Sequence, residues 1–323
     1  MGKKNWLALL LFAIVVAVVP RILGDSYYIS VLVFVGIYSI VTIGLSLLMG
    51  YAGQISLGHA AFFGIGAYTS GLLTTRCALS GWVALPAAIA LAGLLAFLMG
   101  GPTLRLTGHY LAMATLAFGV IVYIFFEAAV DLTGGPSGFG SIPRLSIGGW
   151  RIRTDLHYYY LVWGVTLLVM ILGLNTVHSR VGRALRSIHG SETAARAMGV
   201  NTARHKTRVF ILSACLAALA GGFYAHYVTF ISPSTFDFKF SVTLVTMVAV
   251  GGMSSLWGAL AGTVLLAILP EHLRAFDNYY LLIYGGILIV IMMYVPQGFL
   301  VGLGELVERL FTGIFSRQSR TPV

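Results

Sequence analysis

Residues 176–208 decide the fold, and they read TVHSRVGRALRSIHGSETAARAMGVNTARHKTR. This stretch holds seven of the 20 lysine and arginine residues of the chain and a single acidic residue, Glu192. Long apolar runs precede and follow it. A basic segment between two runs that are each long enough to cross a bilayer indicates a loop held at one face of a membrane.

The loop carries signals for two short helices. Gly190 divides it, because glycine inside a helix costs about 1 kcal/mol relative to alanine. Ser191 is placed to cap the second helix, and the helix dipole favours Glu192 in its first turn. Gly199 stands where a left-handed residue ends a helix. A short, capped, basic helix between two transmembrane spans is typical of a segment that binds another protein.

Two sets of side chains in the loop are candidates for that contact. Ala195 and Met198 are three residues apart, which predicts a small apolar patch on the second helix. Positive charges would orient the partner, and these are Arg183, Arg186 and Arg196. A simpler interpretation is that the charges only retain the loop on the cytoplasmic side, but that does not account for the pattern of glycines and serine.

Composition places the whole chain in a membrane. Hydrophobic residues make up 58% and charged residues 9% of the sequence, whereas soluble domains have about 25% charged residues. The net charge of the chain is +10, and its basic residues cluster in loops between apolar runs. This favours a positive-inside membrane topology over nucleic-acid binding. Cys77 and Cys215 stand in separate apolar contexts and predict neither a disulfide nor a metal site. Residues 1–323 therefore form one all-α transmembrane domain.

Hydropathy predicts about ten transmembrane helices, since each needs about 20 apolar residues. They are expected near 6–23, 28–49, 55–74, 82–100, 108–129, 158–175, 208–231, 240–252, 257–270 and 279–303. The eighth and ninth are short, so residues 240–270 could also form one kinked span. Ten spans put both termini and the 176–208 loop in the cytoplasm, together with most basic residues, including Arg105, Arg309, Arg317 and Arg320.

The third span is rich in glycine and preceded by polar residues. Gln54, Ser56 and His59 bring polar groups to membrane depth, where they must face protein or a water-filled path. Small residues form a stripe on one face of the helix, at Ala60, Gly64, Ala67 and Gly71. Two interpretations stay open, helix packing or the lining of a transport pathway. The candidate lining residues are Gln54, Ser56, His59 and Gly64.

A short later segment is similar to the start of this span. Residues 252–259, GMSSLWGA, resemble residues 53–60, GQISLGHA. Paired glycine-broken segments often mark the central site of a transporter. With ten spans, however, the third and ninth run in the same direction, which an inverted repeat would not do.

The sequence contains no catalytic motif. A Walker lysine motif, HExxH, CxxC and GxSxG are all absent from the chain. We therefore expect a transport subunit that is not an enzyme and that carries no cofactor of its own, with any ATP bound by a partner.

Three stretches together resemble a known family. They are GYAGQISLGHAAFFGIGAYTSGLL at 50–73, GRALRSIHGSETAARAMGVNTARHK at 182–206 and LSACLAALAGGFYA at 212–225. In combination they are similar to the LivM-type permease subunits of branched-chain amino acid ABC importers, and the similarity extends over most of the chain.

The resemblance implies an architecture and a set of partners. The loop would be a coupling loop with a variant of the importer signature, carried by Glu192, Ala194, Ala195 and Gly199. It would dock on separate ATPase subunits, beside a second, similar permease and a periplasmic substrate-binding protein, in the lipid of the bacterial inner membrane. The implied cargo is leucine, isoleucine or valine. Alternatives are a permease for urea or another small polar solute, or an ATP-independent channel or carrier.

Overall fold

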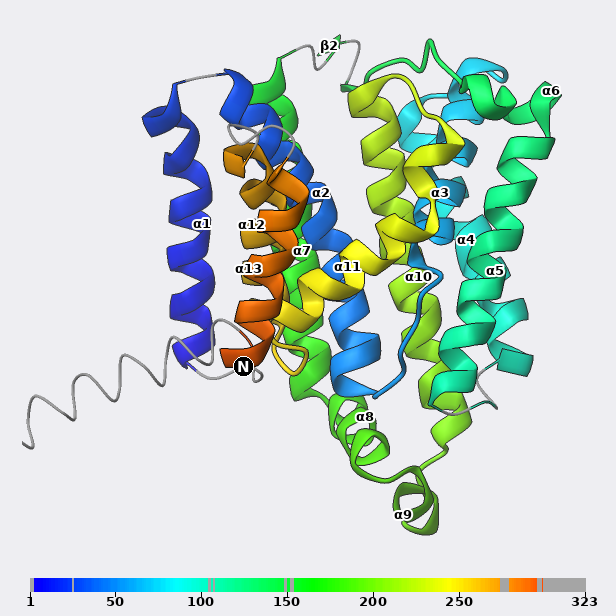
Figure 1. Ribbon diagram of the computed structural model, residues 1–323, viewed down its shortest axis with the longest axis vertical. Coiled ribbons are helices and arrows are strands. Elements are labelled where there is room, and N and C mark those ends of the chain that lie inside the picture. The colour runs from blue at the N-terminus through cyan, green and yellow to red at the C-terminus, as the bar shows by residue number, and fades with distance from the viewer. Residues whose placement is uncertain are drawn as a thin grey trace, which may run out of the picture.

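The computed structural model describes residues 3–24, 26–103, 106, 108–147, 150–151, 154–273, 279–294 and 298. The described chain is a bundle of helices with one two-stranded hairpin at one end (Figure 1). The long elements are α1 (Lys3–Leu23), α2 (Ser26–Ser46), α3 (His59–Thr75), α4 (Gly81–Thr103), α5 (His109–Ala128), α7 (Asp155–His178), α10 (Thr202–Val228), α11 (Phe238–Gly251), α12 (Leu256–Leu273) and α13 (Tyr280–Tyr294).

Short elements connect the long ones. They are the π-helix η1 (Leu47–Tyr51), α6 (Val130–Thr133), the 3₁₀ helices η2 (Gly135–Ser137) and η3 (Pro233–Phe236), the strands β1 (Ser146–Ile147) and β2 (Trp150–Arg151), α8 (Arg180–Gly190) and α9 (Glu192–Ala197). The predicted all-helical class is confirmed, since the only paired strands among the described residues have two residues each.

In the part of the chain that the structure describes, seven helices are long and apolar enough to cross a membrane: α1, α2, α4, α5, α7, α10 and α12. The other three long elements are shorter, because α3 has 17 residues, α11 has 14 and α13 has 15. Uninterrupted spanning helices thus account for seven of the ten predicted spans. The predicted basic residues Arg105, Arg309, Arg317 and Arg320, and the end of the predicted last span, lie outside the described residues.

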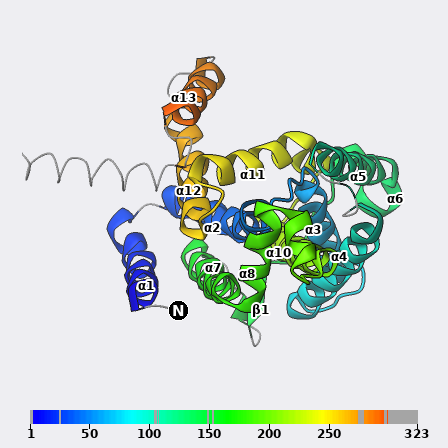
Figure 2. The same cartoon turned by 90° about the horizontal axis from the view of Figure 1, so that it is seen from below.

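Two helices form the centre of the bundle. Neighbours bury 78% of the α2 span and 67% of the α10 span, against 17% of the α1 span. α2 packs against α7, α10 and α12, and α10 packs against α3 and α4 (Figures 1 and 2). Apolar side chains on every side of α2 are therefore buried, which explains why this helix has no polar face.

Glycines allow α3 and α10 to approach closely. A Cβ on Gly66 would lie 2.1 Å from the carbonyl oxygen of Ala218, and one on Gly221 would lie 1.8 Å from that of Phe63. Small residues at such a crossing let two backbones meet. The contact includes Ala67 of the predicted stripe, because a Cβ on Gly221 would lie 3.1 Å from the Ala67 amide nitrogen, whereas Gly64 faces the side chains of Phe126 and Phe236.

Two spans are interrupted. α2 continues into the π-helix η1, after which residues 52–58 are irregular until α3 begins at His59. Beyond α10 the chain is again irregular, apart from η3, until α11 begins at Phe238 and runs obliquely through the middle of the molecule (Figure 1). α11 and α12 are separate helices joined at residues 252–255, so residues 240–270 form two elements and not one kinked helix.

Candidate functional site

α8 and α9 project from one end of the bundle, the same end at which α1 begins (Figure 1). α8 is amphipathic, and it buries Gly182, Leu185 and Ile188 against the bundle. The Ser179 hydroxyl caps its start by accepting a hydrogen bond from the Val181 amide at 3.1 Å. The predicted division of the loop is confirmed, since α8 ends at Gly190 and α9 begins two residues later.

The predicted caps of α9 are confirmed. The Ser191 hydroxyl accepts a hydrogen bond from the Ala194 amide at 3.3 Å. At the other end Gly199 has a φ of 81°, in the left-handed region that favours glycine. The six residues of α9 are too few for a helix that is stable alone, so its stability must come from contacts with the bundle.

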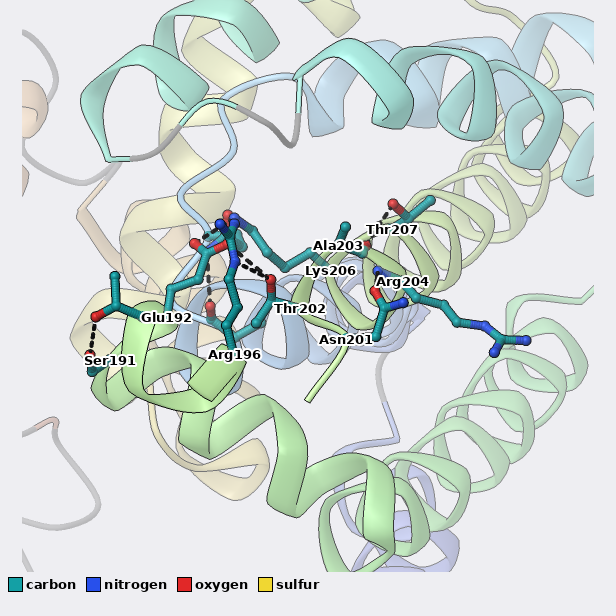
Figure 3. A network of polar contacts seen from close by, with 12 residues as sticks. Ser191, Glu192, Arg196, Asn201, Thr202, Ala203, Arg204, Lys206 and Thr207 are labelled. Atoms are coloured by element: carbon teal, nitrogen blue, oxygen red, sulfur yellow. Dashed lines mark hydrogen bonds and ion pairs between the residues drawn. The ribbon is translucent and has the colours of Figure 1, made fainter. Parts of the chain in front are cut away.

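The Glu192 carboxylate provides the main contact between α9 and α10 (Figure 3). One of its oxygens accepts hydrogen bonds from the Arg196 guanidinium and from the Thr202 hydroxyl. The other accepts from Lys206 Nζ at 2.9 Å, and the Lys206 side chain is only 1% exposed. Arg196 Nε closes the network with a 2.9 Å hydrogen bond to Thr202 Oγ1.

Two effects oppose each other at Glu192. Burial raises the pKa of its carboxyl group, whereas the hydrogen bonds from Lys206, Arg196 and Thr202 and the charge of Lys206 lower it. The second group of effects is larger, so the pKa lies below its ordinary value. Glu192 is therefore ionised at neutral pH and ties α9 to the first turns of α10.

The predicted apolar patch is not formed. Ala195 is 3% exposed and packs inward, whereas Met198 is 85% exposed. The two side chains separate because α9 ends at Ala197, and Met198 already belongs to the turn that follows. Of the residues predicted to contact a partner, those exposed on the outward surface of the loop are Arg183, Arg186, Ala194, Arg196, Met198 and Gly199.

His189 links the loop to the interrupted span, a contact that the sequence did not predict. The carbonyl oxygen of Gly50, in η1, can only accept a hydrogen bond, so His189 Nδ1 donates to it, at 2.8 Å. Gly50 in turn lies against the turn between α11 and α12, where a Cβ would be 1.6 Å from the Met253 carbonyl oxygen. Ser46 Oγ donates to that same oxygen at 3.1 Å.

The polar residues predicted at membrane depth lie inside the protein. His59 is 1% exposed, and its ring nitrogens are 3.0 Å from Ser56 Oγ and 2.7 Å from Ser213 Oγ. Gln54 Nε2 donates to the Ala52 carbonyl, while Gln54 Oε1 has no partner among the described residues. Ser56 and His59 thus meet, whereas Gln54 is hydrogen-bonded to Ala52 and Gly64 faces Phe126 and Phe236.

A cavity of about 320 Å³ lies beside these residues, between α3, α5 and α11. Gln54, Ser56, His59 and Gly64 are absent from its lining. Their neighbours Leu57 and Ala60 form part of its wall, together with residues of α5 and with Phe236, Asp237 and Lys239. The two charged residues were missed from the sequence, because the predicted span began only at residue 240.

Residues 27–293 match the family described as branched-chain amino acid transport system / permease component. The chain belongs to this family. It is 34% identical over 287 residues to the high-affinity branched-chain amino acid transport system permease protein LivM of Escherichia coli, covering 82% of this chain and 68% of that protein. It is 25% identical over 281 residues to LivH of the same organism (81% and 91%), and 24% identical over 318 residues to a probable LivM of Methanocaldococcus jannaschii (83% and 91%). No solved structure matches the chain.

Proposed function

We propose that this chain is a permease subunit of an ATP-driven importer of leucine, isoleucine and valine. Membership of the family and the 34% identity to a LivM permease carry this proposal. The subunit crosses the bacterial inner membrane several times, with both termini and α8–α9 on the cytoplasmic side. It moves its cargo by alternating access and performs no catalysis itself, and ATP is bound by a partner.

The α8–α9 loop is the docking site for the ATPase subunits. Two observations support this role: the Glu192 carboxylate ties α9 to α10, and the exposed surface of the loop carries Arg183, Arg186 and Arg196 beside the exposed Met198. Because α9 is fixed in this way, a movement of the ATPase subunits displaces α9 and α10 together. Arg183, Arg186 and Arg196 orient the partner, while Ala194, Met198 and Gly199 form the contact surface.

We count ten crossings of the membrane from the seven long helices, the two interrupted spans that contain α3 and α11, and α13. α3 needs residues 52–58 to complete its path, and α11 needs the irregular stretch before it. Irregular backbone at membrane depth is tolerated only beside protein or a water-filled cavity. Gln54, Ser56, His59 and Gly64 belong to this interrupted region, so we place the transport pathway along it, with Leu57 and Ala60 on its wall.

Further subunits complete the importer. This chain is similar to LivM and, at lower identity, to LivH, which supports a second, similar permease as its partner. A periplasmic binding protein delivers the amino acid, and lipid surrounds the remaining helices. Nucleic acid plays no part.

The test is uptake by the complex reconstituted into vesicles with its ATPase, partner permease and binding protein. We expect ATP-dependent uptake of labelled leucine that unlabelled valine suppresses and urea does not. Competition by urea would show a permease for small polar solutes. Equal uptake without ATP would show a channel or carrier and would contradict the proposal.

A further inference from the structure

The cavity between α3, α5 and α11 lies near the middle of the bundle. His59, the first residue of α3, contacts Ser213, which is close to the midpoint of α10. The next residue, Ala60, donates its amide hydrogen to Ser241 Oγ in α11 at 3.0 Å. Ala60 and Ser241 both line the cavity, so it opens where the two interrupted spans meet.

Two charged residues of opposite sign line this cavity, Asp237 and Lys239. Charged side chains at such a depth in a membrane protein are costly, and they mark substrate or ion pathways. Asp237 uses Oδ1 to cap α11, accepting from the Phe240 amide at 3.0 Å, and this leaves Oδ2 for another donor. Lys239 is exposed and belongs to neither of the salt bridges found among the described residues.

The rest of the wall is mostly apolar, apart from the side chains of Tyr123 and Ser241, and it comes from the start of α3, from α5, from η3 and from α11. It includes Leu57, Leu116, Val120 and Phe236. The volume of about 320 Å³ lies at the lower end of the range of about 300–1,000 Å³ for small-molecule sites. The cavity therefore suits a small ligand with one positive group, one negative group and a compact apolar part.

We propose that this cavity binds the transported amino acid as its zwitterion during passage through the permease. Asp237 Oδ2 accepts from the α-ammonium group, Lys239 donates to the α-carboxylate, and the branched side chain packs on Leu57, Leu116 and Val120. This site rests on the proposed function, because it assumes that the cargo is an amino acid. Urea has neither charge nor an apolar part, so it would leave the charged pair and the wall unused.

Gly119 provides a way to change the size of the cavity without moving the backbone. It lines the cavity from α5, and a Cβ placed there would lie 3.7 Å from the nearest atom, Gly58 Cα, which is an ordinary contact. Gly119→Ala would therefore fill space in the cavity while α5 keeps its position.

The first experiment measures binding of leucine to the purified pair of permeases without the binding protein, by saturation-transfer NMR. Two analogues are compared with it: leucinamide, which lacks the carboxylate, and 4-methylpentanoate, which lacks the ammonium group. We expect each analogue to bind about tenfold or more weakly than leucine, since each loses a charged hydrogen bond. Asp237→Asn keeps the helix cap, and it should remove the preference for leucine over 4-methylpentanoate.

The second experiment measures leucine uptake and ATP hydrolysis by the full complex. Asp237→Asn and Lys239→Gln should each lower uptake about tenfold, whereas the conservative variant Lys239→Arg keeps the charge and should restore part of the uptake that Lys239→Gln loses. Gly119→Ala should weaken leucine binding to the permease pair more than it weakens binding of the amino acid alanine. Basal ATP hydrolysis reports that each variant is assembled.

The outcomes separate this site from the proposed function. Normal uptake and unchanged analogue preference in Asp237→Asn and Lys239→Gln would overturn the site while leaving the importer intact. If the unaltered complex takes up no amino acid, the proposed function itself is wrong. Equal binding of leucine and both analogues to the unaltered permeases would also overturn the site.

Discussion

Replacing Glu192 by alanine should detach α9 from α10. The substitution leaves the Lys206 ammonium group, 1% exposed, without its carboxylate. Removing one partner of a buried ion pair costs about 3–5 kcal/mol, because the remaining charge is left unpaired. Lys206→Ala should cost less, about 1.5–3 kcal/mol for the lost charged hydrogen bond, since Glu192 is 19% exposed and keeps Arg196 and Thr202 as donors.

Hydrogen exchange of the protein in lipid nanodiscs measures the free energy of local opening of α9, and so the loss caused by each substitution. The amide of Ala195 donates to the Ser191 carbonyl and that of Val200 to the Ala195 carbonyl, both at 3.0 Å. In Glu192→Ala these amides should exchange about 10²- to 4 × 10³-fold faster, as follows from about 3–5 kcal/mol at about 1.4 kcal/mol per factor of ten. Arg204→Ala is the matched control, because Arg204 is also basic and near the start of α10 but points away from the network (Figure 3).

A double-mutant cycle then isolates the pair itself. Glu192→Ala combined with Lys206→Ala should cost less than the sum of the single variants, because no buried charge remains unpaired. The reasoning is refuted if the two effects add to within about 0.5 kcal/mol, the limit for independent sites. Unchanged exchange in Glu192→Ala alone would also refute it.

Three further predictions concern the same loop. His189→Ala should lower the number of leucine molecules transported per ATP hydrolysed, and His189→Gln, which can still donate to the Gly50 carbonyl, should restore part of that ratio; equal ratios in both variants would exclude a role for this hydrogen bond. Met198→Ala should weaken binding of the ATPase subunits in a pull-down and leave exchange at Ala195 unchanged, because Met198 is 85% exposed, and normal ATPase binding would contradict the docking surface. The pKa of the Glu192 carboxyl group is lower in the folded protein than its ordinary value, so the stability that Glu192 contributes is present above the ordinary pKa and is lost as the pH falls through the folded pKa. Hydrogen exchange of the α9 amides, corrected for intrinsic rates, should therefore accelerate only in acid, and Glu192→Gln should remove that pH dependence.

The parts of the loop that the sequence predicted well depend on local chemistry. Whether Ser191 caps a helix, or Gly199 ends one, is decided within about four residues of the chain. The partner of Glu192 is not local, because Lys206 lies 14 residues further on and reaches the carboxylate only after the turn at Gly199 reverses the chain. The exposed position of Met198 depends on that same turn, which helical spacing alone does not contain.

The interrupted spans show why hydropathy failed where the candidate site lies. A window of apolar residues starts the eighth span at residue 240, after Asp237 and Lys239, since two charges cannot face lipid. In the folded chain α11 starts at Phe238, with Asp237 as its cap, and the charges face a cavity shared with α3 and α5. Charge at that depth needs other protein or water around it. Hydropathy averages over one segment and contains no information about a second segment, 181 positions earlier at Ala60, that is hydrogen-bonded to Ser241. The residues that such a window assigns to a loop are therefore the ones that an interrupted span can bring to a transport site.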